Sequence, residues 1–339
     1  MKDVLTYYPE GPFELETGGV IRDLRIGYST YGTLNEKKDN VVWVCHALTA
    51  NSKVPEWWGK VAGEEGLFNP KDYFIVCANI IGSCYGSTGP LDTNPDTGEP
   101  YYGDFPFITL RDIVKAHILL RKHLGIDKIK VCIGGSCGGH QVMEFALMDP
   151  GVIENNVMIV TSARETAWSI AIHTTQRMAM EADGTWGEKH PQAGIEGMKT
   201  ARGIGLLTYR THQAYVDKQT DDDPNVLKDF KASSYIKYQG EKLARRFNAY
   251  SYWHLINALD THHVGRGRGG IPEALKSITA NTLVIGVDTD KLIPFTEQEY
   301  LAEHIPGAIL DVISTPYGHD GFLVEEETVA ALVKKHLKL

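Results

Sequence analysis

The amino-acid sequence predicts an α/β fold in which a mostly parallel β-sheet is flanked by helices and carries an inserted helical cap. Three observations predict it. Short apolar runs typical of buried strands alternate with helix-period segments in the first half of the chain. This alternation stops near residue 164 and resumes after residue 276. A serine also lies in a glycine-rich turn at 134–139, between a predicted strand and a predicted helix. Such alternation indicates parallel strands covered by helices on both faces.

The predicted strands of the first half are compact, rich in β-branched and aromatic residues, and end in turn residues. They lie at 40–48, 72–80, 128–136 and 155–163. Two helices are predicted between them. The helix at 111–125 has apolar residues at helical spacing and stops at a glycine, and the helix at 139–150 is closed by a proline.

The second half contains a long helical region and then a return to the α/β pattern. Residues 164–276 include polar–apolar helical stretches, such as 194–215, and few strand-like runs. Strands are predicted at 280–290 and 308–315, and helices at 296–305 and 323–338. We therefore expect a core domain formed by 1–163 and 277–339, with a helical cap at 164–276. An insertion of this kind commonly covers an active site.

Charge and hydropathy exclude several classes of protein. The chain has 339 residues and a formal net charge of -9, which argues against a nucleic-acid partner held by bulk charge. No apolar run approaches the roughly 18 residues that a membrane helix needs. The first residues, MKDVLTYYPEGPFELE, lack the apolar stretch of a signal peptide. We expect a cytoplasmic enzyme with no membrane association.

The cysteine and histidine spacings do not predict a metal site. Five cysteines, at 45, 77, 84, 132 and 137, form neither a CxxC pair nor a zinc motif, so reduced thiols are expected. Asp260, His262 and His263 are close in sequence, but a fourth ligand is missing from this group. We expect no metal.

The sharpest local motif is GGSCGG at 134–139, which fits Gly-x-Ser-x-Gly with Ser136 at its centre. The motif follows a predicted strand and opens a predicted helix, the context in which a strained turn exposes a nucleophilic serine. A glycine-rich turn of this type can also be purely structural or can bind a phosphate. The motif alone leaves these readings open.

Two later residues complete a catalytic triad in the order serine, acid, histidine. Asp290 follows the predicted strand at 280–290, and His319 follows the one at 308–315. His319 would take the proton of Ser136, and Asp290 would orient the imidazole. Asp288 is the alternative acid, and we prefer Asp290 because we expect Asp288 to lie within the strand.

The predicted oxyanion hole consists of two backbone N–H groups, those of Leu48 and Cys137. The first lies in the loop after an early strand, and the second follows the nucleophile. The Cys137 thiol is a rival nucleophile on the same turn. We expect it to point away from the pocket and to serve in packing.

The chain resembles the homoserine O-acetyltransferase family of methionine biosynthesis, within the α/β-hydrolase superfamily. The resemblance spans nearly the whole chain, and its matching blocks are CHALTAN, ANIIGSCYGSTGP, NPDTGEPYYGDFPFITLRD, GGSCGG, TARGIGLLTYR, YQGEKLARRF, VGRGRGG and GVDTDKLIP. It implies a ping-pong reaction in which Ser136 takes acetyl from acetyl-CoA and passes it to the hydroxyl of L-homoserine. Acetyl-CoA is then a co-substrate, and no cofactor is implied.

The resemblance also implies the residues that bind the acceptor. Arg202 and Tyr209 match the family's substrate-binding arginine and tyrosine, and Asp320 matches its ammonium-binding acid. Arg202 and Tyr209 are seven residues apart, which places them two turns apart on one face of a helix. Without the resemblance, a solvated helix charge is the alternative interpretation of Arg202. Family members commonly form homodimers through the cap, and we expect the same here.

Several positions depart from the family pattern. Cys137 replaces a methionine, Ala50 replaces a glycine near the oxyanion loop, and residues 173–177 read HTTQR where relatives have a Phe-Asn-Glu-like run. Ala50 leaves open whether the donor is acetyl-CoA or succinyl-CoA. The acceptor could also be a close analogue of homoserine such as serine.

Other interpretations of the sequence stay open. A serine hydrolase that sends the acyl group to water and a binding protein without chemistry are the alternative functions. The segment VGRGRGG at 264–270 could contact the phosphates of CoA, or its arginines could pair with the cap, which we favour slightly.

Overall fold

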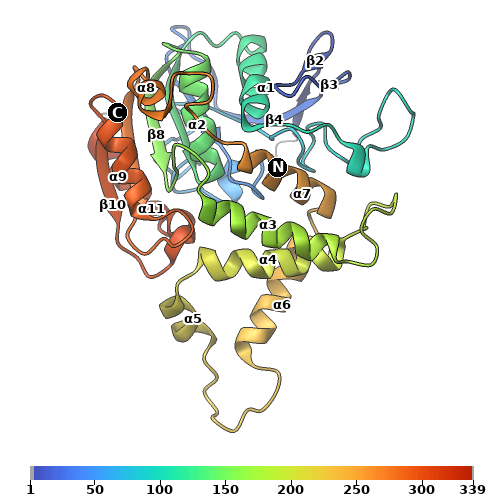
Figure 1. Ribbon diagram of the computed structural model, residues 1–339. Coiled ribbons are helices and arrows are strands. Elements are labelled where there is room, and N and C mark those ends of the chain that lie inside the picture. The colour runs from blue at the N-terminus through green and yellow to red at the C-terminus, as the bar shows by residue number, and fades with distance from the viewer. Residues whose placement is uncertain (1–3, 338–339) are drawn as a thin grey trace.

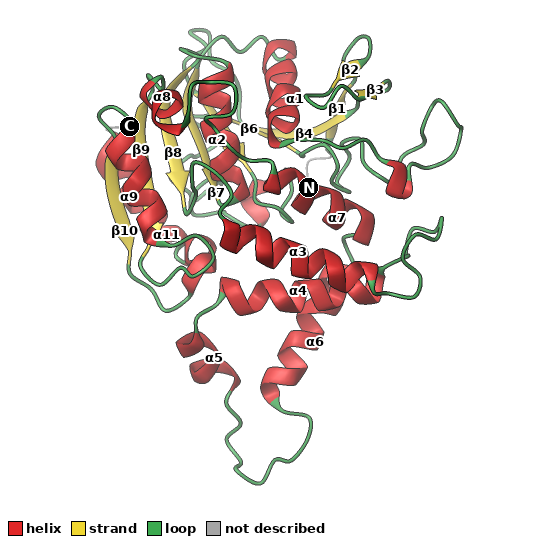
Figure 2. Ribbon diagram, in the orientation of Figure 1, coloured by secondary structure: helices red, strands yellow, loops and turns green. Residues whose placement is uncertain are grey.

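The computed structural model describes residues 4–337, and within this range the centre of the molecule is an eight-stranded β-sheet (Figures 1 and 2). The predicted core domain also includes 1–3 and 338–339, which lie outside the described residues. The strand order is β1-β4-β6-β5-β7-β8-β9-β10. The strands are Leu5–Tyr7 (β1), Ile26–Tyr31 (β4), Val41–Cys45 (β5), Phe74–Ala78 (β6), Ile129–Gly135 (β7), Ile153–Ile159 (β8), Asn281–Val287 (β9) and Ile309–Ile313 (β10). Strands β5 to β10 pair in parallel, which confirms the predicted mostly parallel sheet.

Helices cover both faces of this sheet. One face packs against α1 (Leu110–His123), α2 (Cys137–Met148) and α9 (Phe295–His304), and the other packs against α11 (Glu326–Leu337) and residues 54–68. Every residue of β5 is buried, because this strand lies in the middle of the sheet between the two layers. None of the described helices is both long and apolar enough to cross a bilayer.

The amino-terminal strands were not predicted. Strand β1 pairs antiparallel with β4, and β4 pairs antiparallel with β6. A separate two-stranded sheet is formed by β2 (Phe13–Glu14) and β3 (Val20–Ile21). These strands are short, and β4 has the sequence IGYSTY, in which glycine and serine weaken the strand signal.

Most of the inserted helices lie beyond the carboxyl edge of the parallel strands (Figure 1). They are α3 (Ala167–Glu181), α4 (Ile195–Tyr209), α5 (His212–Gln219), α6 (Lys231–Ala244) and α7 (Ala249–Asp260). Helix α8 (Ile271–Lys276) lies at the opposite end of the sheet, where the chain enters β9 (Figure 1). Helices α3 and α4 run side by side, and α5 and α6 project as an arm (Figure 1). Leu255 of α7 and Leu275 of α8 belong to the same apolar core as α1 and α2. The boundary of the cap at 164–276 stays a prediction.

Two stretches predicted as single helices are each divided. The stretch 194–215 breaks at Arg210, whose backbone is extended, and the Thr211 hydroxyl caps α5 by accepting a hydrogen bond from the backbone N–H of Ala214. The predicted helix 323–338 is split at Glu325, which separates α10 (Gly321–Val324) from α11, and its last residue lies outside the described range. The first break matters for the site, because it directs the chain after α4 toward the loop that holds His319.

Candidate active site

Ser136 lies at the tight turn between β7 and α2. Its φ of 56° and ψ of -125° form a conformation that residues other than glycine rarely adopt. Glycine is required at two positions beside it, because a Cβ on Gly138 would lie 2.1 Å from the Cys45 carbonyl oxygen and one on Gly135 would lie 2.5 Å from the Phe322 ring. The strained turn presents the Ser136 hydroxyl at the carboxyl edge of the sheet.

The structure brings Ser136, His319 and Asp290 into one chain of hydrogen bonds. Ser136 Oγ lies 2.8 Å from His319 Nε2, and His319 Nδ1 lies 2.7 Å from Asp290 Oδ2. The second Asp290 oxygen accepts hydrogen bonds from the backbone N–H groups of Leu292 and Ile293 at 2.8 and 3.0 Å. These bonds fix the carboxylate, and the carboxylate in turn fixes the imidazole. The arrangement can activate a hydroxyl as a nucleophile.

The alternative acid Asp288 is not part of this chain. Strand β9 ends at Val287, so the expectation that Asp288 lies within the strand is wrong. Asp288 Oδ2 accepts a hydrogen bond from Ser314 Oγ at 2.6 Å, which ties the loop after β9 to the loop after β10. The side chain that contacts His319 is that of Asp290.

The electrostatic environment favours a proton on His319. Burial lowers its pKa, but the Asp290 carboxylate outweighs burial with help from Asp320 and Glu165. The pKa of His319 therefore lies above the ordinary value of 6.5. The imidazolium that forms when the ring takes a proton from Ser136 is stabilised.

The two predicted oxyanion donors flank Ser136. Leu48 and Cys137 both line the cavity at the serine, and Cys137 is the first residue of α2, where the helix dipole favours negative charge. The Cys137 thiol is buried and accepts a hydrogen bond from Gln141 Nε2 at 3.4 Å. Burial raises the pKa of this thiol to about 12, so it is not a competing nucleophile at neutral pH. All five cysteines, which lie within residues 4–337, are free.

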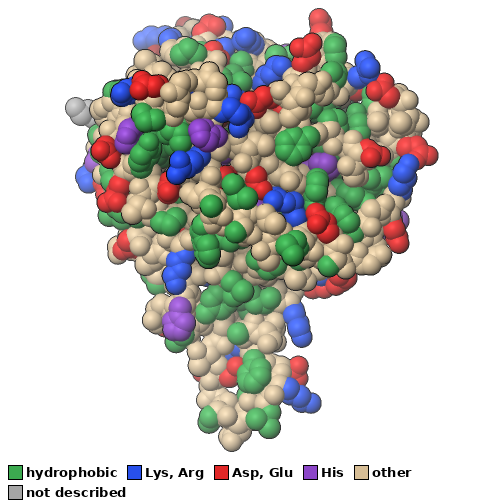
Figure 3. Space-filling view, in the orientation of Figure 1, with side chains coloured by type: hydrophobic (Ala, Val, Ile, Leu, Met, Phe, Trp, Pro, Cys, Tyr) green, Lys and Arg blue, Asp and Glu red, His purple; other side chains and the backbone are tan. Residues whose placement is uncertain are grey.

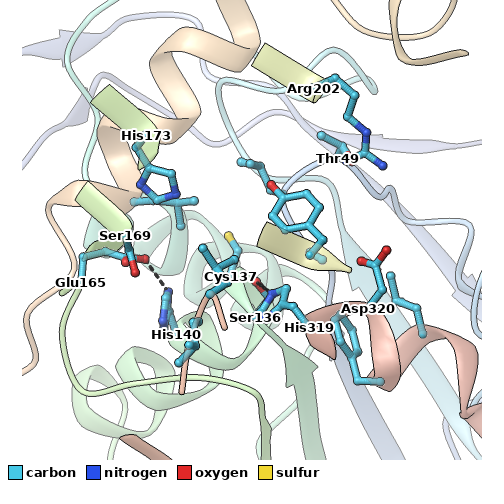
Figure 4. A pocket seen from close by; sticks show the side chains of 18 residues that line it. Thr49, Ser136, Cys137, His140, Glu165, Ser169, His173, Arg202, His319 and Asp320 are labelled. Atoms are coloured by element: carbon cyan, nitrogen blue, oxygen red, sulfur yellow. Dashed lines mark hydrogen bonds and ion pairs between the residues drawn. The ribbon is translucent and has the colours of Figure 1, made fainter. Parts of the chain in front are cut away.

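A cavity of about 100 Å³ opens above Ser136 (Figure 4). Polar side chains stand on two opposite sides of the serine in this view. We call one group the Arg202 side and the other the Glu165 side. The Arg202 side consists of Thr49, Arg202, Tyr209 and Asp320, and the Glu165 side consists of His140, Glu165, Ser169 and His173.

The three predicted acceptor-binding residues are together on the Arg202 side. Arg202 and Tyr209 both come from α4, and the Arg202 guanidinium carbon lies 5.6 Å from the centre of the Tyr209 ring. The Tyr209 ring is 5.8 Å from that of His319. Arg202 forms no ion pair with any carboxylate of residues 4–337, whereas Asp320 pairs with Arg210 at 2.8 Å. A half-buried, unpaired guanidinium in a cavity can bind an anion.

The Glu165 side was not predicted from the sequence. Glu165 and Ser169 come from the start of the inserted region, and His140 follows Ser136 by one turn of α2. Burial raises the pKa of Glu165 and lowers that of His140 well below its ordinary value. The available signals were the position of His140, four residues after the nucleophile, and the unusual run that begins at His173.

Two other segments do not take part in the cavity as expected. Ala50, which raised the question of the acyl donor, is absent from the residues that line it; its N–H donates to the Ala47 carbonyl in a turn. In VGRGRGG, Arg266 pairs with Glu16 at 2.9 Å and Arg268 with Glu144 at 2.7 Å. These carboxylates belong to the core, so the expectation that the arginines pair with the cap is wrong.

The histidines near Asp260 do not form a metal site. Asp260 Oδ1 lies 2.7 Å from His173 Nδ1, and the His262 ring stacks on that of His140 with centroids 4.1 Å apart. Within the part of the chain that the structure describes, no three His, Cys, Asp or Glu side chains are placed to hold a metal ion.

Comparisons with known proteins agree with this geometry. Residues 40–326 match the model of the alpha/beta hydrolase fold family. A protein of Cyclobacterium marinum named homoserine O-acetyltransferase is 47% identical over 97% of this chain and 93% of its own. The crystal structure of homoserine O-acetyltransferase from Staphylococcus aureus is 30% identical, with a TM-score of 0.82 over 99% of this chain and 95% of that one. The crystal structure of esterase E22 has a TM-score of 0.89 over 99% of both chains, but at 21% identity it shows the fold alone.

Proposed function

We infer that this chain, which belongs to the α/β-hydrolase fold family and within it to the homoserine O-acetyltransferases, moves the acetyl group of acetyl-CoA to the hydroxyl of L-homoserine. The products are O-acetyl-L-homoserine and CoA, as methionine biosynthesis requires. The observation that carries the proposal is the unpaired Arg202 guanidinium, which lines the same cavity as the hydrogen-bonded Ser136, His319 and Asp290. An acceptor that carries a carboxylate can be held by such a cation, whereas transfer of the acyl group to water needs none.

In the first half-reaction, His319 takes the proton of Ser136 as Oγ attacks the thioester carbonyl. The backbone N–H groups of Leu48 and Cys137 stabilise the oxyanion of the tetrahedral intermediate. The intermediate collapses by breaking the C–S bond, and His319 returns the proton to the CoA sulfur. Asp290 keeps the imidazole in the tautomer that this transfer needs. Ser136 is left as an acetyl ester.

In the second half-reaction, the homoserine hydroxyl gives its proton to His319 and attacks the acetyl ester. The C–O bond to Ser136 then breaks, and His319 protonates the serine oxygen. Arg202 holds the substrate carboxylate, Tyr209 adds a hydroxyl, and Asp320 receives the ammonium group. These contacts bring the amino alcohol to the ester ahead of water, and the helices above the cavity limit the access of water.

The test measures thiol release from acetyl-CoA with and without homoserine. Sustained release that depends on homoserine, together with O-acetylhomoserine identified by mass, is the expected result. Sustained release that ignores homoserine would indicate a hydrolase and refute the transferase. Ser136→Ala should abolish release, and unchanged turnover in that variant would remove Ser136 from the mechanism. A parallel assay with serine as acceptor tests the choice of amino alcohol.

We also propose that two copies associate through the projecting arm, in the cytoplasm, where thiols stay reduced. Large apolar side chains are exposed on the arm and on the end of α4 that leads into it, namely Leu207 of α4, Leu227 and Tyr238 at 64%, 89% and 54% exposure, and apolar surface gathers on the arm (Figure 3). Such a patch is typical of an interface. Sedimentation should give a dimer that Leu207→Glu dissociates. A wild-type protein that sediments as a monomer contradicts the proposal.

A further inference from the structure

The Glu165 side of the cavity is a buried polar chamber next to the nucleophile. Glu165, His140, Ser169 and His173 are 8%, 1%, 2% and 6% exposed, and all four line the cavity (Figure 4). His140 Nδ1 has no hydrogen-bond partner among the described atoms and lies 3.7 Å from Glu165 Oε1, too far for a hydrogen bond. Buried polar groups are rarely left without partners. We therefore expect the polar side chains of this chamber to act on the part of the substrate that enters it.

The stereochemistry of acyl transfer decides which part of the substrate faces this chamber. The acyl carbon on Ser136 carries its oxygen toward the N–H groups of Leu48 and Cys137. The leaving or attacking group must lie within reach of His319, on the side of Arg202. The acyl chain must then point in the remaining direction, toward the Glu165 side of the cavity.

No Lys or Arg side chain of residues 4–337 pairs with the Glu165 carboxyl. The nearby cation, Arg177, is 2.7 Å from Asp260, and the same carboxylate holds His173 Nδ1 at 2.7 Å. Burial raises the pKa of Glu165, whereas His173 and the Ser169 hydroxyl lower it and favour the ionised form. In that form, Glu165 brings into the chamber a negative charge that no described Lys or Arg compensates.

We propose that the Glu165 side is the acyl chamber and that the Glu165 carboxylate excludes acyl groups that carry a negative charge. The donor is then a short, uncharged acyl thioester such as acetyl-CoA, and succinyl-CoA is rejected. The inference rests on the proposed function, because it concerns the acyl group of the same Ser136 ester.

A second carboxylate in this chamber is unfavourable in either protonation state. If both groups stay ionised, they repel each other in a site from which water is largely removed. If one takes a proton, the free energy of protonation at neutral pH must be supplied. A small acetyl group meets neither cost, and Leu259 provides apolar surface in the same cavity.

The experiment follows acylation of Ser136 without acceptor, by rapid quench and intact-protein mass, for three donors. Acetyl-CoA tests the reaction, succinyl-CoA tests the charge, and butyryl-CoA matches the four-carbon length of succinyl without its charge. We expect the wild-type protein to accept butyryl-CoA at least about tenfold faster than succinyl-CoA. Glu165→Gln keeps the shape and should raise the ratio of succinylation to acetylation by at least about tenfold.

Asp288→Asn is the matched control, because it removes one carboxylate that lies outside the cavity and outside the hydrogen-bond chain of Ser136. It should leave the ratio of succinylation to acetylation unchanged, which separates a local effect from one of net charge. Equal exclusion of butyryl-CoA and succinyl-CoA by the wild-type protein would overturn the proposal in favour of size, and this comparison does not depend on any variant folding. An unchanged ratio in an acetylating Glu165→Gln variant would also overturn it. Absence of an adduct from every donor would instead refute the proposed function.

Discussion

Removal of the Arg202 side chain should separate the two half-reactions. Arg202→Ala takes away the unpaired cation of the cavity, and nothing in the hydrogen-bond chain from Ser136 to Asp290 depends on it. Acetyl-enzyme formation from acetyl-CoA should therefore persist. The use of homoserine should weaken, because its carboxylate loses the group that we propose to hold it.

The magnitude follows from the contacts that are lost. A guanidinium that donates two charge-assisted hydrogen bonds to a carboxylate contributes about 3 kcal/mol to the free energy of binding. This figure uses the lower value for each bond, because Arg202 is only half-buried. That corresponds to a rise of about 150-fold in the KM for homoserine. Arg202→Lys keeps the charge but not the forked geometry, and its KM should rise about tenfold.

The assay combines a burst measurement with steady-state titration. The burst of thiol released without homoserine reports acetyl-enzyme formation, and the titration reports the acceptor. Tyr209→Phe is the control for indirect effects, since the Tyr209 ring lies against both Arg202 and His319. If the burst rate falls as far as the rate with homoserine in Arg202→Ala, while Tyr209→Phe keeps the burst rate of the wild type, the role given to Arg202 is wrong.

Three further variants test other parts of the structure. Asp290→Asn should lower kcat about 10⁴-fold. In the wild type, His319 stops acting as a base when the pH falls through its pKa, which lies above 6.5 because Asp290 raises it. The remaining activity of Asp290→Asn should therefore persist to lower pH than that of the wild type. A pH–rate profile that the substitution does not shift would contradict this. Gly138→Ala should destabilise the fold by at least about 3 kcal/mol in urea unfolding, because its Cβ would lie 2.1 Å from the carbonyl oxygen at the end of β5. Near-wild-type stability would show that the turn is not so confined. Arg268→Gln should cost about 2–3 kcal/mol by leaving Glu144 short of a partner, without changing the KM for acetyl-CoA; a raised KM would indicate a contact with CoA.

The sequence predicts the central part of the fold well because its signals are local. Most residues of β5, β6, β7 and β9 are apolar and buried, since both faces of these strands are covered, and Ser136 follows β7 in a glycine-rich turn. The positions of Asp290 and His319 follow from strand order alone. The short strands β1 to β4 have no comparable run, because they lie at or outside the antiparallel edge of the sheet.

Other features depend on contacts that no local pattern encodes. The partners of Arg266 and Arg268 are Glu16 and Glu144, which are distant in sequence. The Glu165 side is assembled from α2 and the region before and within α3, so its residues are separated until the inserted helices fold back over Ser136. The same limit explains why Ala50, close to the oxyanion loop in sequence, could be taken for a residue of the cavity.

The placement of charge around His319 links the two sides of the cavity to the chemistry at its centre. Asp290, Asp320 and Glu165 each raise the pKa of this histidine, while burial lowers it. The base must be neutral to accept a proton, so these carboxylates favour the imidazolium at the expense of the resting base. Asp320 is already compensated by Arg210, and a bound ammonium group would compensate it further. Arrival of the amino acid then lowers the pKa of His319 and makes the neutral base more available when the hydroxyl must be deprotonated, so the contact that recognises the acceptor also prepares the base for it.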